Sequence, residues 1–243
     1  MRLDRWLVTL GEGSRSQLQR IIRAGRVTVN GSPLRDPSAD CDTEGAALTV
    51  DGRELDGRLT RHIMLCKPAG LLTAARDKKQ PTVMDLFPPS FATMGCMPVG
   101  RLDKDTTGLL LLTTDGELNH RLLSPKRHVW KTYEAEVDGP LTAEDEAAFH
   151  DGMELGDFVS AEAELCILQS GNDSALARVR VHEGKFHQIK RMFEHRGRTV
   201  TRLRRLTFGS LTLDETLEDG AWRELTKAEI AALYADAAME ENA

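Results

Sequence analysis

The 243-residue sequence has no long hydrophobic run. No apolar stretch approaches the roughly 20 residues that a membrane-spanning helix needs. The first residues, MRLDRWLVTLGEG, mix charged with apolar side chains, so we expect no signal peptide. These two absences predict a cytoplasmic protein that does not associate with a membrane.

Cysteine is also scarce. The four cysteines, Cys41, Cys66, Cys96 and Cys166, are scattered and form no CxxC pair. Without a secretion signal, this spacing predicts buried free thiols in a reducing compartment. The same spacing argues against a zinc site, and we expect no metal.

The chain as a whole lacks an excess of positive charge, since its formal net charge is -6. Two segments nevertheless are basic. Residues 1–35 carry seven arginines against Asp4 and Glu12, and residues 178–205 carry ten Lys or Arg against two acids. Because the local field attracts phosphate, these two basic segments favour nucleic-acid binding over the alternative of two merely solvated helical faces.

The N-terminal segment predicts two short helices followed by a strand. Residues 3–10 place apolar side chains at helical spacing. Ser14 and Gln17 match a capping box that opens a second helix, and Gly25 stands where a C-terminal glycine belongs. A short strand is expected at residues 26–29, with a hairpin turn at Asn30-Gly31.

This segment, SRSQLQRIIRAGRVTVNGSPL, resembles the S4 RNA-binding domain. The resemblance implies two helices and a loop that present basic side chains to structured RNA. The matching basic positions are Arg2, Arg5, Arg15, Arg20, Arg23 and Arg26. The alternative is a generic helical domain whose arginines only confer solubility. Residues 51–61 are polar and predict a linker, so we place an S4-like domain at residues 1–57.

Residues 58–243 predict a second domain that mixes strands and helices. Because the two kinds of element do not alternate regularly, we expect an α+β fold with a mixed, mainly antiparallel sheet flanked by helices. The acidic tail, residues 214–243, is expected to form an exposed helix. The other expected elements are strands at 63–66, 109–112, 133–137 and 175–182, and a helix at 186–196.

Two aspartates stand between an arginine and an apolar run, in GRLDKDTTGLLLL. Asp103 and Asp105 match the DxDxT pattern of haloacid-dehalogenase phosphatases, which bind magnesium. That family places its motif directly after an apolar strand, whereas Pro98, Gly100 and Arg101 interrupt the sequence here. A plainer alternative is that both aspartates only shape a turn.

The wider stretch VGRLDKDTTGLLLLTTDGELNHRLLSP resembles the central motif of RNA pseudouridine synthases, in particular the RsuA-type branch that acts on small-subunit ribosomal RNA. LCKPAGLL precedes it, and KTYEAEV and HEGKFHQIKRMFEHRG follow in the family's order. With the S4-like start, the resemblance spans nearly the whole chain. Two departures are Cys66, where the family has a polar Asn, and Phe186, where a Tyr is common.

The resemblance implies an isomerisation without a cofactor. Converting uridine to pseudouridine breaks the N1–C1′ bond and joins C5 to C1′, so no atom is gained and no electron is transferred. Asp103 is implied as the catalytic carboxylate, which attacks C1′ or C6 or removes the 2′ proton. Tyr133 is implied to stack on the uracil, and Lys190 to keep Asp103 ionised.

The resemblance also implies contacts to substrate and RNA. Arg101 would fill the space that the flipped uridine leaves, and Ile189 would pack under the base. Lys67 is assigned to substrate binding and Arg191 to RNA binding. Plainer roles are a salt bridge from Arg101 to Asp105, a solvated Lys190 and a core position for Ile189. The histidines near the motifs are interpreted as RNA contacts or structural residues: His120, His128, His182, His187 and His195.

The predicted partner is 16S ribosomal RNA, either free or inside a 30S assembly intermediate, and the enzyme is expected to be a monomer. One alternative is a pseudouridine synthase that acts on 23S ribosomal RNA. Another is a non-catalytic S4-type protein that binds RNA during ribosome assembly.

Overall fold

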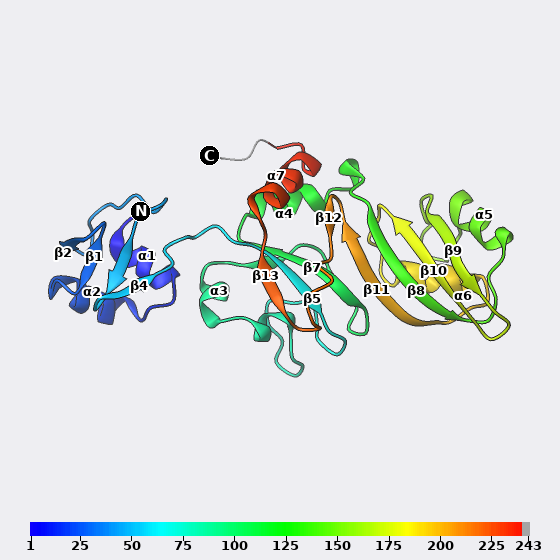
Figure 1. Ribbon diagram of the computed structural model, residues 1–243, viewed down its shortest axis with the longest axis horizontal. Coiled ribbons are helices and arrows are strands. Elements are labelled where there is room, and N and C mark those ends of the chain that lie inside the picture. Colours follow the sequence, from blue (N-terminus) through cyan, green and yellow to red (C-terminus); the bar gives the residue numbers. More distant parts are fainter. Residues whose placement is uncertain (240–243) are drawn as a thin grey trace. The chain divides into compact units, whose positions relative to one another are not determined.

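A four-stranded antiparallel sheet and short helices form the N-terminal part of the computed structural model, which describes residues 1–239. Residues 1–61 and 84–97 group into one compact unit. Its strands follow the order β2-β1-β3-β4 (Figure 1). Its elements are α1 (Leu3–Thr9), α2 (Arg15–Arg23), β1 (Val27–Val29), β2 (Ser32–Leu34), β3 (Leu48–Val50), β4 (Arg53–Leu55) and α3 (Pro89–Thr93).

Local sequence signals explain how this unit begins. The Ser14–Gln17 capping box forms at the start of α2, and Gly25 takes a left-handed conformation (φ +73°) just after its end. Asn30 and Gly31 both have positive φ, as the turn between β1 and β2 requires. The helices bury Trp6, Leu7, Leu18 and Ile22 against the sheet. These predicted features are confirmed.

The predicted linker at residues 51–61 is wrong in its first part. Residues 53–55 form β4, which pairs with β3 through a turn at Asp51 and Gly52, both of positive φ. β4 is an edge strand whose side chains are mostly exposed. Its sequence is therefore polar, and its pairing with β3 rather than an apolar pattern defines it as a strand. The predicted division between residues 57 and 58 stays a prediction.

The second unit comprises residues 62–83 and the chain from 98 onward. Its sheet follows the order β13-β5-β7-β11-β8-β10-β9, and β12 pairs with β11. The pair β7–β11 is parallel and the other pairs on this path are antiparallel, which confirms the α+β prediction. Its strands are β5 (His62–Lys67), β7 (Thr107–Thr113), β8 (Lys131–Asp138), β9 (Glu164–Ser170), β10 (Ser174–Val181), β11 (Val200–Phe208), β12 (Leu211–Thr212) and β13 (Trp222–Glu224). Its helices are α4 (Gly116–Leu123), α5 (Ala143–Asp151), α6 (Gln188–His195) and α7 (Lys227–Asp236).

Three short elements complete the chain. Two of them, η1 (Val83–Leu86) and β6 (Met97–Pro98), lie where the sequence passes from one unit to the other. The third, η2 (Pro125–Arg127), is a 3₁₀ turn that directly precedes the segment leading into β8.

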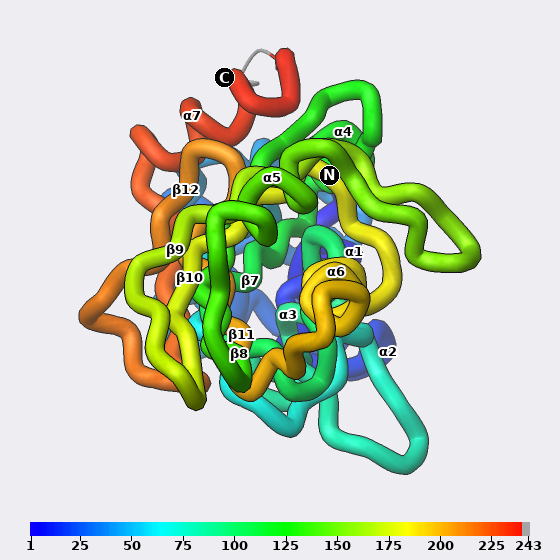
Figure 2. Tube along the Cα trace, turned by 90° about the vertical axis from the view of Figure 1, so that its right-hand side faces the viewer, coloured from blue at the N-terminus to red at the C-terminus, as the bar shows by residue number. Residues whose placement is uncertain are grey.

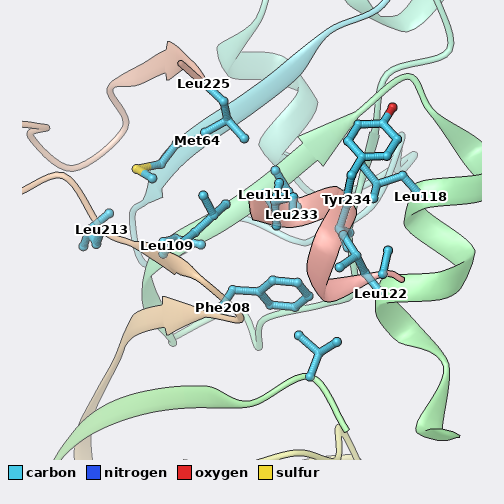
Figure 3. Packing of buried hydrophobic residues seen from close by; sticks show 14 of the residues in the cluster. Met64, Leu109, Leu111, Leu118, Leu122, Phe208, Leu213, Leu225, Leu233 and Tyr234 are labelled. Atoms are coloured by element: carbon cyan, nitrogen blue, oxygen red, sulfur yellow. The ribbon is translucent and has the colours of Figure 1, made fainter. Parts of the chain in front are cut away.

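One apolar cluster of the second unit lies between β5, β7 and the helices α4 and α7 (Figure 3). Met64 and Leu111 come from the strands, and Leu118, Leu233 and Tyr234 from the helices. The acidic tail was expected to be an exposed helix, and this is wrong for α7, because Leu233 and Tyr234 are buried. The last four residues of that tail, and of the predicted second domain, lie outside the described residues.

Helices α5 and α6 cover one face of the strands β11, β8, β10 and β9 (Figures 1 and 2). Along β10, Ala177, Val179 and Val181 are buried, as the alternating pattern predicts. Helix α6 begins at Gln188, two residues later than expected. The reason is local, because His187 adopts a left-handed conformation (φ +52°) that an α-helix cannot continue through.

Two further expectations concern burial. Cys41, Cys66 and Cys96 are buried free thiols as predicted, but Cys166 is exposed on β9, where the sheet face is open to solvent. None of the helices within residues 1–239 combines the length and the hydropathy that crossing a bilayer requires.

Candidate active site

The loop that carries Asp103 precedes β7 and is held by backbone and side-chain hydrogen bonds. The Thr106 amide donates to the Asp103 carbonyl at 3.1 Å, which closes a turn. The Thr73 hydroxyl donates to the Leu102 carbonyl at 2.8 Å, and the Gly70 amide donates to the Lys104 carbonyl at 2.7 Å. The position of Asp103 is therefore fixed from both sides of the turn.

Lys67 supports this loop from beneath. Its side chain is fully buried, and its ammonium donates to the carbonyl oxygens of Pro68, Lys104 and Thr106. Burial lowers the pKa of Lys67 to about 8, although Asp105 and Asp103 act in the opposite direction. Its three hydrogen bonds within the chain point to a role in holding the loop, and the assignment of Lys67 to substrate binding stays a prediction.

Asp103 lies between two basic side chains of the segment that begins α6. His187 Nε2 is 3.6 Å from Asp103 Oδ1, and Lys190 Nζ is 3.4 Å from Asp103 Oδ2. Lys190 also contacts Asp105 Oδ1 at 2.5 Å, and this contact holds the pKa of Asp105 below its usual range. Two nitrogen atoms of basic side chains therefore lie within 4 Å of the Asp103 carboxylate, at the edge of a pocket.

Five of the predicted residues line one pocket in the second unit: Arg101, Asp103, Tyr133, Ile189 and Lys190. Its lining includes the apolar side chains of Ile189 and of Val181 and Leu203 from the sheet. Charged side chains such as Asp103 and Lys190 line it as well. A flat, partly polar ring such as uracil could therefore contact apolar side chains while its sugar faces the carboxylate.

Tyr133 reaches this pocket from the centre of β8. It stands opposite Val179 of β10 and Arg205 of β11 in the strand register. Its ring is largely buried, and its hydroxyl has no hydrogen-bond partner among the described residues. The ring face and the hydroxyl are thus available to a ligand.

Two predicted arginines, Arg101 and Arg191, differ in their contacts. Arg101 is exposed and makes no ion pair with a described residue, so the alternative salt bridge to Asp105 is not formed. Arg191 does not line the pocket. Its guanidinium donates to Leu155 O and to Asp157, and stacks 4.8 Å over the Phe158 ring, which fixes the loop after α5 to α6.

The sequence reasoning missed His187 as a site residue. It was grouped with histidines of structural or RNA-contact role, because no nucleophile is near it in the sequence. The available signal was its place three residues before Lys190. Only the folded structure shows that both side chains reach Asp103, with His187 in a left-handed conformation just before α6.

Comparisons with known proteins agree with this geometry. The model of the RNA pseudouridylate synthase family matches residues 61–195, and the S4 domain model matches residues 1–45. The chain belongs to the RNA pseudouridine synthase family. It is an enzyme of that family with an N-terminal S4 domain.

Relatives of this pseudouridine synthase match over nearly their full length. A ribosomal small subunit pseudouridine synthase A of Pseudomonas aeruginosa is 39% identical, over 95% of this chain and 99% of the relative. An uncharacterized RNA pseudouridine synthase of Bacillus subtilis is also 39% identical, over 95% and 97%. A crystal structure of a pseudouridylate synthase superposes with a TM-score of 0.66 at 34% identity, covering 96% of this chain and 99% of the other.

The S4 domain of the synthase contains the six predicted RNA-binding arginines, and three of them form internal ion pairs. Arg2 and Arg15 both contact the buried Asp4, whose pKa the hydrogen bonds from Arg2 hold far below its usual range. Arg26 pairs with Asp51. The other three arginines make no ion pair with a described residue: Arg5, Arg20 and Arg23.

Proposed function

We propose that this enzyme isomerises one uridine of 16S ribosomal RNA to pseudouridine, with Asp103 as the nucleophile. The small-subunit assignment is supported by relatives that are named for the ribosomal small subunit. The single observation that supports the chemistry is the position of Asp103, which faces a pocket that also holds Tyr133 and lies within 4 Å of two basic groups.

The proposed reaction conserves every atom of the substrate. The N1–C1′ bond breaks, C5 bonds to C1′, and the C5 proton is lost while N1 gains one. Asp103 bonds transiently to C1′ as N1 leaves, and this bond breaks when C5 bonds to C1′. Lys190 and His187 lie beside the attacking carboxylate. Tyr133 stacks on the uracil and assists removal of the C5 proton. Such an isomerisation requires no redox or group-transfer cofactor.

The substrate uridine must leave its stack to reach Asp103. Arg101 lies at the pocket with a free, exposed guanidinium, and we assign it to the space that the flipped base vacates. Ile189 then supports the base from below. Lys67 acts indirectly by holding the loop, and Arg191 by fixing the segment that follows α5.

The test maps pseudouridine in 16S and 23S RNA by carbodiimide-stop primer extension. Cells that lack the protein are compared with cells that carry the wild type or Asp103→Asn. We expect one 16S stop to disappear without the protein and to return only with the wild type. With purified protein, Asp103→Asn should reduce turnover by at least about a thousandfold while it retains RNA binding.

Other outcomes separate the alternatives. A lost stop in 23S RNA would keep the chemistry and contradict the 16S assignment. Unchanged maps together with normal RNA binding would favour a non-catalytic role in ribosome assembly. Comparing naked 16S RNA with 30S assembly intermediates in vitro identifies the form of the substrate. A monomer, a cytoplasmic location and a domain division at residues 57 and 58 stay predictions.

A further inference from the structure

A second, larger pocket adjoins the candidate active site in the same unit. Its volume is about 740 Å³. It shares Arg101, Tyr133 and Lys185 with the first pocket, and it extends toward His128 and Phe208. The reaction proposed above uses only the first pocket and assigns no role to the side chains that line the rest of the second.

Two buried cations line this pocket, Lys131 of β8 and Arg205 of β11. The Lys131 ammonium donates to Val129 O at 2.8 Å and to His182 O at 3.3 Å, which uses two of its three N–H groups. Arg205 Nε donates to Leu109 O at 2.7 Å, and its buried Nη2 has no partner. Both groups therefore retain hydrogen-bonding capacity.

No carboxylate of the described chain neutralises these two charges by an ion pair. Both lie against the Phe208 ring, at 5.6 Å for Lys131 and 5.2 Å for Arg205. Glu183 is the acid of the pocket, and its carboxylate accepts from the Ala161 amide and from Gln188. Its charge acts to raise the pKa of Lys131, but it forms no ion pair with Lys131 or Arg205. Burial, with the nearby Arg205, lowers the pKa of Lys131 to about 8. An anion in the pocket would relieve this repulsion.

We propose that this pocket binds one backbone phosphate of the substrate RNA beside the reacting uridine. Lys131 donates a charge-assisted hydrogen bond to it, and Arg205 supplies positive charge from beneath. Lys185, which lies at both pockets, holds the exposed side. The inference rests on the proposed function, because it needs a nucleotide whose uracil lies against Tyr133.

Shared residues favour a phosphate of the same RNA strand over a free anion. Tyr133 belongs to both pockets, so a group bound in the second lies within the reach of a nucleotide whose base occupies the first. Phosphate contacts position a nucleic acid without reading its sequence. This pocket would therefore set the register of the strand, so that the uridine meets Asp103.

The first experiment tests the anion site without RNA. Thermal unfolding is followed in inorganic phosphate and in chloride at equal ionic strength, because a ligand of the native state raises Tm. We expect phosphate to raise the Tm of the wild type and of Lys227→Met, a control at an exposed lysine on α7. Lys131→Met should lose this shift. An equal shift in all three proteins, or none in the wild type, would overturn the site.

The second experiment identifies the source of the phosphate. Wild type is titrated with RNA oligonucleotides that contain the target uridine and carry one neutral methylphosphonate at each neighbouring position in turn. One position should weaken binding about tenfold, the loss of one charge-assisted contact. At that position, Lys131→Met should show less than about a twofold further effect, and inorganic phosphate should compete with the unmodified RNA.

The arms separate the possible failures. A phosphate-induced Tm shift without any sensitive methylphosphonate position would mean a site for a free anion, and would overturn the RNA assignment. The wild-type arms need no substitution, so they decide even if Lys131→Met does not fold. If mapping finds no target uridine, the proposed function fails, while the phosphate titration still reports on the anion site.

Discussion

At the scale of single residues, Lys190 is shared by two carboxylates. Its ammonium is closer to Asp105, at 2.5 Å, than to Asp103, at 3.4 Å. Asp105 is mostly exposed, whereas Asp103 is three-quarters buried and lines the pocket. Because Coulomb energies are larger where water is excluded, the longer contact to Asp103 has the greater consequence for chemistry.

We therefore predict that loss of the Lys190 charge affects kcat far more than loss of the Asp105 charge. Lys190→Met should lower kcat about 10- to 100-fold, since the nucleophile loses a nearby cation. Asp105→Asn should change kcat less than about threefold, because Lys190 remains beside Asp103.

The measurement is tritium release from RNA labelled at C5 of uridine, under saturating RNA and across pH. Lys190→Arg serves as the conservative control and should retain most activity. A large loss in Asp105→Asn with little change in Lys190→Met would contradict the assignment of Asp103 as the nucleophile.

At the scale of elements, the junction of β7 and β11 determines where the Asp103 loop ends. Gly108 pairs with Arg205 in the parallel ladder and has a positive φ of +95°. A Cβ at this position would overlap the carbonyl oxygen of Arg205. The close approach of these strands places the Asp103 loop beside the Tyr133 strand, because β11 lies between β7 and β8.

Gly108→Ala should accordingly destabilise the fold by about 2 to 4 kcal/mol, through steric overlap and an unfavourable φ. Gly116→Ala is the matched control, since Gly116 begins α4 with open space around it. This change should alter stability by less than about 1 kcal/mol, in the stabilising direction. Urea unfolding measures both, and equal effects would contradict the role of the β7–β11 contact.

At the scale of the whole molecule, the net charge of -6 does not show which basic residues are paired with carboxylates and which are free. Many arginines of the two basic segments form internal ion pairs, among them Arg2, Arg26 and Arg196. Arg20 and Arg23, in the last turn of α2, are exposed and make no ion pair with a described residue. We expect the free arginines to contribute more to RNA binding than the paired ones, because a paired arginine must first give up its carboxylate.

We predict that RNA affinity falls steeply with salt and that the free arginines determine the slope. In the full chain, changing both Arg20 and Arg23 to Gln should reduce the slope of log K against log salt by about one to two. Arg26→Gln, at a residue paired with Asp51, should reduce it by less than about 0.5. Filter binding over a salt series measures this, and a flat dependence in the wild type would argue against phosphate contacts.

The sequence by itself determined the local structure of this protein and its family. Capping boxes, turn glycines and alternating strands depend on neighbouring residues, so Ser14, Gly25 and Val179 could be interpreted directly. The order of the motifs around Asp103, Tyr133 and Lys190 indicated the chemistry. The polar edge strand β4 and the buried face of α7 were not predicted, because a partner strand and packing against distant residues define them.

Only the tertiary structure decided which side chains reach one another. Lys67 is as basic in sequence as Lys190, yet it is buried beneath the loop while Lys190 lines the pocket. His187 and Asp103 are distant in sequence, and the fold places His187 Nε2 3.6 Å from Asp103 Oδ1. Lys131 and Arg205 likewise line one pocket because their strands, β8 and β11, are neighbours in the sheet. Such contacts depend on register and packing across the sheet, which no local pattern specifies.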